Sequence, residues 1–214
     1  GRCDQRCYVY ESVCSVEGLR VEFVTVRQTV NGQIIERSER KDILTSFSGR
    51  HRDQYRAREI ADRECFGLER AKKNGISTQL IPRGKSFSSD LKNILPENSD
   101  LIVLAGFLSI LSKDFCESFK GQIINIHPAL LPKFGGKGMW GNHVHKAVLE
   151  AQEKESGATV HFVTSGIDEG EIILQGKFEI AENETPETLA QKVHQIEYEI
   201  FPKAIDLVLN KRVP

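Results

Sequence analysis

The chain has 214 residues, of which 29 are basic and 30 are acidic, so its formal net charge at pH 7 is −1. This length accommodates one α/β domain with a substantial core better than two full domains. The balanced charge excludes a broad attraction to nucleic acid or to an anionic membrane, so we expect small molecules as partners.

No apolar run approaches the ~20 residues that a membrane-spanning helix needs. Residues 1–4, Gly-Arg-Cys-Asp, lack the apolar stretch of a signal peptide, so we expect a cytoplasmic protein. The chain has 5 cysteines, an odd number. The spacing of Cys3, Cys7 and Cys14 contains no Cys-x-x-Cys pair, which argues against a disulfide framework and against a zinc site.

Residues 1–60 contain local strand signals. Asn31-Gly32 is the turn signal of a β-hairpin, and it predicts a hairpin over residues 21–35. Another strand is predicted from residue 42, running into a turn at Gly49. The basic residues that follow are either a solvated surface or a group that binds phosphate through charge-assisted hydrogen bonds; they are Arg50, Arg52 and Arg56.

From residue 66 onward, helical and strand patterns alternate. The predicted helices cover residues 67–75, 88–95 and 112–119, a segment that ends at 150, and a segment that begins at 185. The predicted strands cover residues 76–81, 100–107, 123–126, 158–164 and 171–180. The continuous apolar run at 100–107 is typical of a strand covered on both faces of a parallel sheet. The pattern therefore predicts an α/β fold, an open, mostly parallel, twisted sheet with helices on both faces.

Asn125 and His127 stand at the end of the predicted strand that Pro128 terminates. Side chains two positions apart in a strand point to the same side, and ligands bind at the carboxyl ends of parallel strands. Asp168 lies in a loop between two glycines and is a candidate partner for His127. An amide, an imidazole and a carboxylate suit attack on a carbonyl group, as oxyanion donor, proton carrier and orienting acid. The simpler alternative is that Asn125 and His127 only cap a strand.

Residues 135–145 contain four glycines, which predict a loop that is either mobile or packed closely on another backbone. We interpret this loop as a border of the active site, with Trp140 as a stacking surface. His143 and His145 lack a suitably spaced third ligand, so no metal is expected. His161 and Thr164 are interpreted as core residues of their strand.

Three segments resemble a known family: Asn-Ile-His-Pro-Ala-Leu-Leu-Pro-Lys-Phe at 125–134, Gly-Ala-Thr-Val-His-Phe-Val-Thr at 157–164 and Ile-Asp-Glu-Gly-Glu-Ile-Ile-Leu-Gln at 167–175. They resemble the phosphoribosylglycinamide formyltransferases of purine synthesis, from about residue 61 to residue 214. The resemblance implies a Rossmann-like formyltransferase fold and transfer of a formyl group from 10-formyltetrahydrofolate to the amine of phosphoribosylglycinamide. It also implies a monomer or homodimer that needs no metal.

Carried over position by position, the resemblance implies that Asn125, His127 and Asp168 are catalytic. It implies that Pro128 and Glu197 contact the acceptor. The folate would meet Thr164 and the backbone of a segment that could equally be a plain helix entry: Leu108, Ser109, Ile110 and Leu111. Gly49 falls where the family has a glycine-rich, phosphate-binding loop, although only one glycine stands there.

The family pattern is missing from residues 1–60, which we treat as an atypical segment ahead of an α/β domain at 61–214. Only about a dozen residues separate Gly49 from Ala61, too few for a crossover helix and a strand. Either a natural replacement or a disturbed reading frame upstream of Ala61 accounts for this, and we hypothesise the second. Three rival functions stay open: hydrolysis of formyl-folate, formylation of another amine, and binding of folate without catalysis.

Overall fold

The computed structural model describes residues 19–25, 29–30, 33–34, 55–97, 99–107 and 109–210. Several predictions fall outside these residues. They concern the three amino-terminal cysteines, the strand from residue 42, Gly49, Arg50, Arg52 and Leu108.

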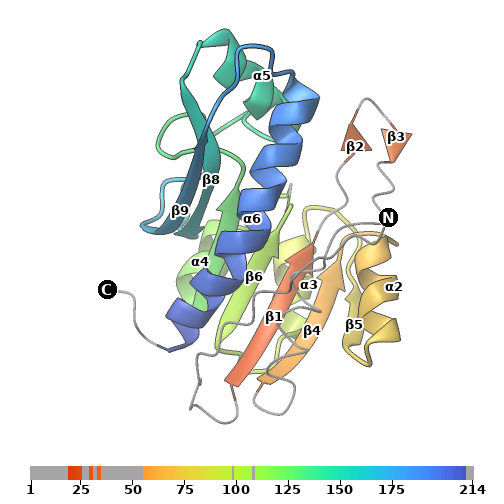
Figure 1. Ribbon diagram of the computed structural model, residues 1–214. Coiled ribbons are helices and arrows are strands. Elements are labelled where there is room, and N and C mark those ends of the chain that lie inside the picture. Colours follow the sequence, from red (N-terminus) through yellow and green to blue (C-terminus); the bar gives the residue numbers. More distant parts are fainter. Residues whose placement is uncertain are drawn as a thin grey trace.

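The fold is built on one seven-stranded sheet with the order β5-β4-β1-β6-β7-β8-β9 (Figure 1). The first five strands in this order are parallel, whereas β8 is antiparallel to β7 and β9 is antiparallel to β8. The sheet is therefore mostly parallel, as predicted. Its strands are β1 (Leu19–Thr25), β4 (Tyr55–Ala61), β5 (Ser77–Leu80), β6 (Leu101–Ala105), β7 (Gln122–His127), β8 (Glu155–Phe162) and β9 (Ile172–Glu179).

Helices cover both faces of the sheet, each with its own hydrophobic cluster. On one face, side chains of α6 and Ala71 of α2 pack on strands β6, β7 and β8. On the other face, side chains of α3 and α4 pack on β4, β6 and β7. The described helices are α2 (Phe66–Lys73), α3 (Phe87–Ile94), α4 (Lys113–Ser118), α5 (Asn142–Glu150) and α6 (Pro186–Leu209). The α/β class and the helices on both faces are thus confirmed.

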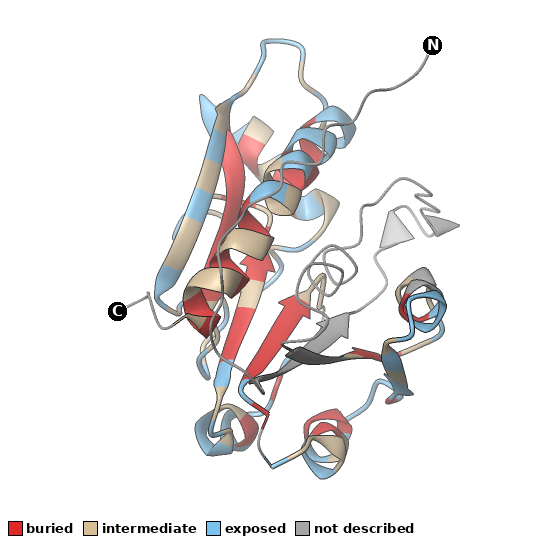
Figure 2. Cartoon of the chain, turned by 60° about the horizontal axis from the view of Figure 1, so that its bottom comes forward, coloured by how far each residue is buried: buried red, intermediate tan, exposed pale blue. Residues whose placement is uncertain are grey.

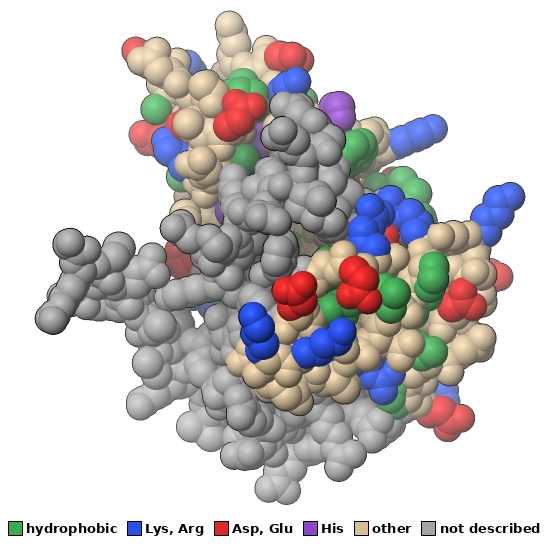
Figure 3. All heavy atoms as spheres, turned by 90° about the vertical axis from the view of Figure 1, so that its right-hand side faces the viewer, with side chains coloured by type: hydrophobic (Ala, Val, Ile, Leu, Met, Phe, Trp, Pro, Cys, Tyr) green, Lys and Arg blue, Asp and Glu red, His purple; other side chains and the backbone are tan. Residues whose placement is uncertain are grey.

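Burial follows the sequence pattern. Four successive residues of β6 are buried, which explains its unbroken apolar run (Figure 2). Helix α6 begins after Thr185, whose hydroxyl accepts a hydrogen bond from the Thr188 backbone N–H, and Pro186 occupies its first turn. Figure 3 shows acidic and basic side chains side by side on one face of the described part. Within that part of the chain, every helix is too short or too polar to cross a lipid bilayer.

The predicted hairpin over residues 21–35 is only partly right. Strands β2 (Thr29–Val30) and β3 (Gln33–Ile34) pair antiparallel around residues 31–32, as the turn signal indicated. Residues 21–25, however, belong to β1, which lies in parallel between β4 and β6. The local pattern of a strand does not reveal its distant partners.

The position of β1 also explains why so few residues separate Gly49 from Ala61, because the first strand of the sheet lies much earlier in the chain than residue 42. The parallel strands β1 and β4 are joined by residues 26–54, well above the ~10–12 residues that a crossover requires. The sheet therefore extends across the boundary at residue 60 that was expected from the sequence.

Candidate active site

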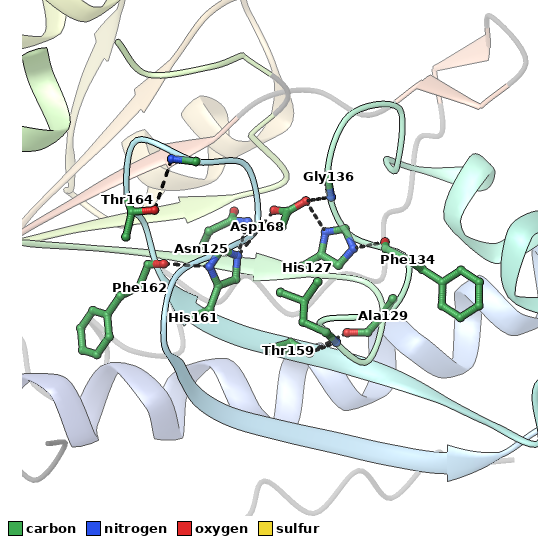
Figure 4. Close-up of polar contacts among 12 residues, drawn as sticks. Asn125, His127, Ala129, Phe134, Gly136, Thr159, His161, Phe162, Thr164 and Asp168 are labelled. Carbon is green, nitrogen blue, oxygen red and sulfur yellow. Dashed lines mark hydrogen bonds and ion pairs between the residues drawn. The ribbon is translucent and has the colours of Figure 1, made fainter. Parts of the chain in front are cut away.

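The candidate site lies where β7 ends beside β8. Asn125 and His127 are on β7, and Asp168 lies in the loop between β8 and β9. Figure 4 shows Asn125, His127 and His161 directed toward Asp168. The three residues expected to be catalytic are thus brought together, although Asp168 is separated from β7 by a whole strand and loop.

Both ring nitrogens of His127 face oxygen atoms. Nε2 lies 2.8 Å from the Phe134 carbonyl oxygen, and Nδ1 lies 3.5 Å from Oδ2 of Asp168. A neutral imidazole has one N–H, so it can donate to only one of these two acceptors. The doubly protonated ring donates to Phe134 and faces the Asp168 carboxylate with its second N–H. Donation to both acceptors at once therefore requires a proton on each ring nitrogen.

Asp168 is held by the glycine-containing loop that follows Phe134. The Gly136 backbone N–H donates to Oδ2 of Asp168 at 3.0 Å, and the Asp168 side chain is 12% exposed. Asp168 has a φ of +57°, a left-handed conformation that Asp tolerates better than most residues. A Cβ added to Gly135 would lie 3.2 Å from Cβ of Asp168. The loop at this point packs closely on another segment, which is one of the two alternatives that its glycines left open.

His161, which the sequence assigned to the core, also contacts two of the predicted catalytic residues. Its Nδ1 lies 2.8 Å from the Phe162 carbonyl oxygen and its Nε2 lies 3.2 Å from Nδ2 of Asn125. Nε2 is also 3.6 Å from Oδ1 of Asp168. Burial lowers the pKa of His161, so the neutral ring is favoured.

This neutral ring fixes the orientation of the Asn125 amide. In the neutral ring, Nδ1–H donates to Phe162, so Nε2 carries a lone pair and accepts from Nδ2 of Asn125. One N–H of the Asn125 amide is occupied in this way. The other N–H has no partner among the residues that the structure describes and can donate to a ligand oxygen. A histidine in a buried strand gave no sequence signal of this role, because Asn125 lies 36 positions away.

A second set of hydrogen bonds fixes the chain just after His127. The Thr159 hydroxyl donates to the Ala129 carbonyl at 2.6 Å and accepts from the Leu131 N–H at 3.1 Å. The Gln175 amide donates to the Leu131 carbonyl and to the Thr159 hydroxyl, both at 2.9 Å. The backbone that carries the Phe134 carbonyl is therefore tied to β8 and β9.

The segment expected to meet the folate is only partly covered by the structure. Helix α4 begins at Lys113, after a cap in which the Ser112 hydroxyl accepts from the Phe115 N–H, so residues 109–111 are not helical. Ile110 is 70% exposed, and the Ser109 hydroxyl oxygen is buried without a hydrogen-bond partner among the described residues. An exposed apolar side chain beside an unpartnered polar atom suits a flat, partly polar ligand.

The remaining predicted residues lie around this centre. Thr164 is exposed and its hydroxyl accepts from the Gly166 N–H at 3.3 Å, at the start of the Asp168 loop. Pro128 directly follows His127 and is half-buried. Glu197 is on α6, with Oε2 2.6 Å from Nδ1 of His194. In the part of the chain that the structure describes, no three His, Cys, Asp or Glu side chains gather as a metal site.

A family model described as formyl transferase matches residues 49–205. The chain belongs to the formyl transferase family. The match begins before residue 61, where the resemblance was expected to start, and residues 1–48 lie outside it.

One of two similar curated relatives carries the name of the enzyme that the motifs resemble, and the other is named as a purine biosynthetic protein. A phosphoribosylglycinamide formyltransferase named as chloroplastic, from Arabidopsis thaliana, is 38% identical over 158 residues, which are 71% of this chain and 54% of the relative. A trifunctional purine biosynthetic protein adenosine-3 from Drosophila melanogaster is 41% identical over 152 residues, 68% of this chain and 11% of the relative. The chain thus spans about half the length of the Arabidopsis relative and a small part of the length of the Drosophila relative.

Solved structures agree with the fold. The phosphoribosylglycinamide formyltransferase of Coxiella burnetii has a TM-score of 0.73 and 31% identity, covering 92% of this chain and 89% of that one. The one from Anaplasma phagocytophilum has a TM-score of 0.76 and 28% identity, covering 92% and 90%. A formyltetrahydrofolate deformylase from Pseudomonas syringae has a TM-score of 0.76 at 21% identity, which supports the fold alone. The expected Rossmann-like formyltransferase fold is confirmed.

Proposed function

We propose that the chain transfers a formyl group from 10-formyltetrahydrofolate to the primary amine of phosphoribosylglycinamide, a step of de novo purine biosynthesis. The observation that carries the proposal is the convergence of Asn125, His127 and Asp168 at the end of β7. The name of the Arabidopsis relative supports the choice of acceptor, because it denotes this reaction, and the Drosophila relative is named as a purine biosynthetic protein.

The main barrier is geometric and electrostatic. The acceptor amine has a pKa near ~8, so freeing its lone pair at pH 7 costs only about 1 kcal/mol. Holding the amine against the formyl carbon contributes ~7–11 kcal/mol, and one oxyanion donor contributes ~3–4 kcal/mol. The site is therefore asked chiefly to orient two substrates and to stabilise an oxygen anion.

The polar groups divide this work. The amine nitrogen attacks the formyl carbon, and the electrons of the C=O bond move onto oxygen. The second N–H of Asn125 donates to this oxyanion, and the Nδ1–H of His127, which faces Asp168 at 3.5 Å, is shared between the carboxylate and the oxyanion. Asp168 keeps the imidazolium in place, and its Oδ1 accepts the proton that the attacking amine loses, directly or through water. That proton passes to the departing folate nitrogen as its bond to the formyl carbon breaks.

The neighbouring residues bind the two substrates. The pterin of the folate lies along Leu108, Ser109, Ile110 and Leu111 and beside Thr164, where the exposed side chain of Ile110 supplies an apolar contact. Pro128 and Glu197 contact the acceptor. No step of this reaction calls for a metal, and the cosubstrate is the formyl-folate itself.

The test is an assay of formyl transfer and of formate release, with and without phosphoribosylglycinamide. Formylated product that appears only with this acceptor supports the proposal. Equal formate release in both conditions would assign the chain to hydrolysis of formyl-folate instead. Formyl-folate binding without consumption, with any amine, would indicate a silent folate-binding protein.

Two further properties stay predictions. The cytoplasmic location is tested by following a fluorescent fusion of the chain in cells, since the Arabidopsis relative is named as chloroplastic. The monomeric or homodimeric state is tested by sedimentation velocity.

A further inference from the structure

A second polar cluster lies between α5 and the amino-terminal half of α6, which pack against each other (Figure 1). It consists of His145 on α5 and of His194 and Glu197 on α6, and we call it the Glu197 cluster. His145 is 3% exposed and the Glu197 side chain is 15% exposed. Ionisable side chains are seldom so buried unless each polar atom has a partner.

One oxygen of Glu197 is firmly held and the other is not. Nδ1 of His194 donates to Oε2 of Glu197 at 2.6 Å, across one turn of α6. Such a short contact with a carboxylate is typical of a charge-assisted hydrogen bond. Oε1 of Glu197 receives no hydrogen bond from any residue that the structure describes. His194 therefore fixes the carboxylate and leaves one acceptor oxygen available.

His145 contributes a second available atom. Its Nδ1 is buried and has no hydrogen-bond partner among the described residues. The pKa of His145 is lowered to about 4, chiefly by burial; the charge of His194 also lowers it, the charge of Glu197 raises it, and the charge of His127 lowers it slightly. His145 is thus neutral at pH 7 and close enough to feel the charges of both the Glu197 cluster and His127.

We propose that His194 is a positioning residue, which holds Glu197 so that Oε1 accepts an N–H or O–H group of the acceptor substrate, with Nδ1 of His145 as a second polar contact. The inference rests on the proposed function, since the occupant is the polar, non-reacting part of the amine. Two polar atoms on the packed helices α5 and α6, each without a hydrogen-bond partner among the described residues, suit a ligand rich in hydrogen-bonding groups.

The test compares His194→Leu with His194→Asn. Leucine fills the volume without a donor, whereas the amide nitrogen of asparagine lies at the same distance from the backbone as Nδ1 of histidine. His194→Leu should raise the KM for phosphoribosylglycinamide ~10–100-fold, the range for losing a hydrogen bond to a charged group. The kcat and the KM for formyl-folate should stay near those of the wild type. His194→Asn should restore most of the acceptor affinity.

Two controls separate positioning from a merely structural role. Gln195→Leu changes the exposed neighbour of His194 and should leave both KM values unchanged. In a Glu197→Gln background, His194→Leu should have little further effect, because the residue acts through Glu197. An unchanged acceptor KM in His194→Leu overturns the inference, and so does full additivity of the two substitutions in the double variant. The proposed function still stands in that case, provided that the wild type formylates phosphoribosylglycinamide.

Failure of the proposed function can also be distinguished from failure of this inference. If the wild type formylates no phosphoribosylglycinamide, the proposed function fails, and calorimetric binding of phosphoribosylglycinamide to the wild type and to His194→Leu decides the inference. Weaker binding in the variant supports it. Equal binding, or no binding to either protein, overturns it.

Discussion

The molecule contains two histidine clusters that differ in how completely their polar atoms are paired. In the Asp168 cluster, formed by Asn125, His127, His161 and Asp168, each of the four imidazole nitrogens lies near an oxygen or nitrogen partner. In the Glu197 cluster, Oε1 of Glu197 and Nδ1 of His145 have no hydrogen-bond partner among the described residues.

This difference in pairing suggests different roles for the two clusters, catalysis and substrate binding. Buried polar groups that satisfy one another form a rigid network, which suits groups that must keep one geometry throughout a reaction. Buried polar atoms left unpaired cost free energy unless a ligand pairs with them, which suits recognition of a substrate. We therefore expect substitutions in the Asp168 cluster to lower kcat and substitutions in the Glu197 cluster to raise the KM for the acceptor.

Asp168→Asn should have the largest effect. The amide oxygen can occupy the position of Oδ2 and accept from the Gly136 N–H, so the fold is kept, whereas the negative charge that faces Nδ1 of His127 is lost. Turnover should fall ~10²–10⁴-fold, the usual contribution of a positioned proton-transfer group, with folate binding nearly intact. Glu169→Gln, an exposed change in the same loop, is the control. Unchanged turnover in Asp168→Asn would remove the catalytic role of this cluster.

The pH dependence of stability tests the Glu197 cluster. His145 has a pKa of about 4 in the folded protein, below its ordinary value of 6.5. Above pH 6.5 neither the folded nor the unfolded state binds this proton, so His145 does not lower the free energy of unfolding there. As the pH falls from 6.5 to 4, only the unfolded state takes the proton, which costs the folded state ~3 kcal/mol. Below about pH 4 both states are protonated and the loss stops.

The measurement is urea unfolding of the wild type and of His145→Asn at several pH values. The free energy of unfolding of the wild type should fall by ~3 kcal/mol more than that of the variant between pH 6.5 and 4. If the free energies of unfolding of the two proteins change in parallel with pH, burial does not lower the pKa of His145.

His161 tests whether the pairing within the Asp168 cluster matters for turnover. His161→Phe keeps an aromatic ring but removes the acceptor for Nδ2 of Asn125. A misdirected oxyanion donor should lower kcat ~10²-fold with little change in either KM. His161→Gln places an amide oxygen close to where Nε2 stands, so it should recover much of the loss. Equal kcat values for both variants would contradict the orienting role.

The sequence predicted the described elements from residue 66 onward to within a few residues, because their hydrophobic periods and caps are local. The strand predicted at 100–107 is β6, and the hydroxyl cap and proline predicted at 185–186 begin α6. The place of β1 was not predictable in this way, since it depends on pairing with residues 55–61 and 101–105.

The sequence predicted the side chains of the candidate site but not the backbone groups that hold them. Asn125, His127 and Asp168 were indicated by residue type and by the resemblance, whereas the Phe134 carbonyl and the Gly136 N–H are backbone groups that no residue type reveals. The pairing of His194 with Glu197 did leave a signal. Residues three apart on a helix are neighbours, so a histidine there was a foreseeable partner for the carboxylate.

The smallest expected effect concerns the close packing that holds Asp168. A Cβ at Gly135 would lie 2.5 Å from Cδ2 of the buried Leu131 and 3.2 Å from Cβ of Asp168. Gly135→Ala should therefore cost ~1–2 kcal/mol in thermal or urea unfolding, as overpacking does, and should lower kcat through the displaced carboxylate. Gly84→Ala is the control, because nothing lies within 4 Å of the added atom there. If Gly135→Ala is destabilised but keeps full kcat, Leu131 alone has moved, and the Asp168 cluster tolerates more freedom than its hydrogen bonds indicate.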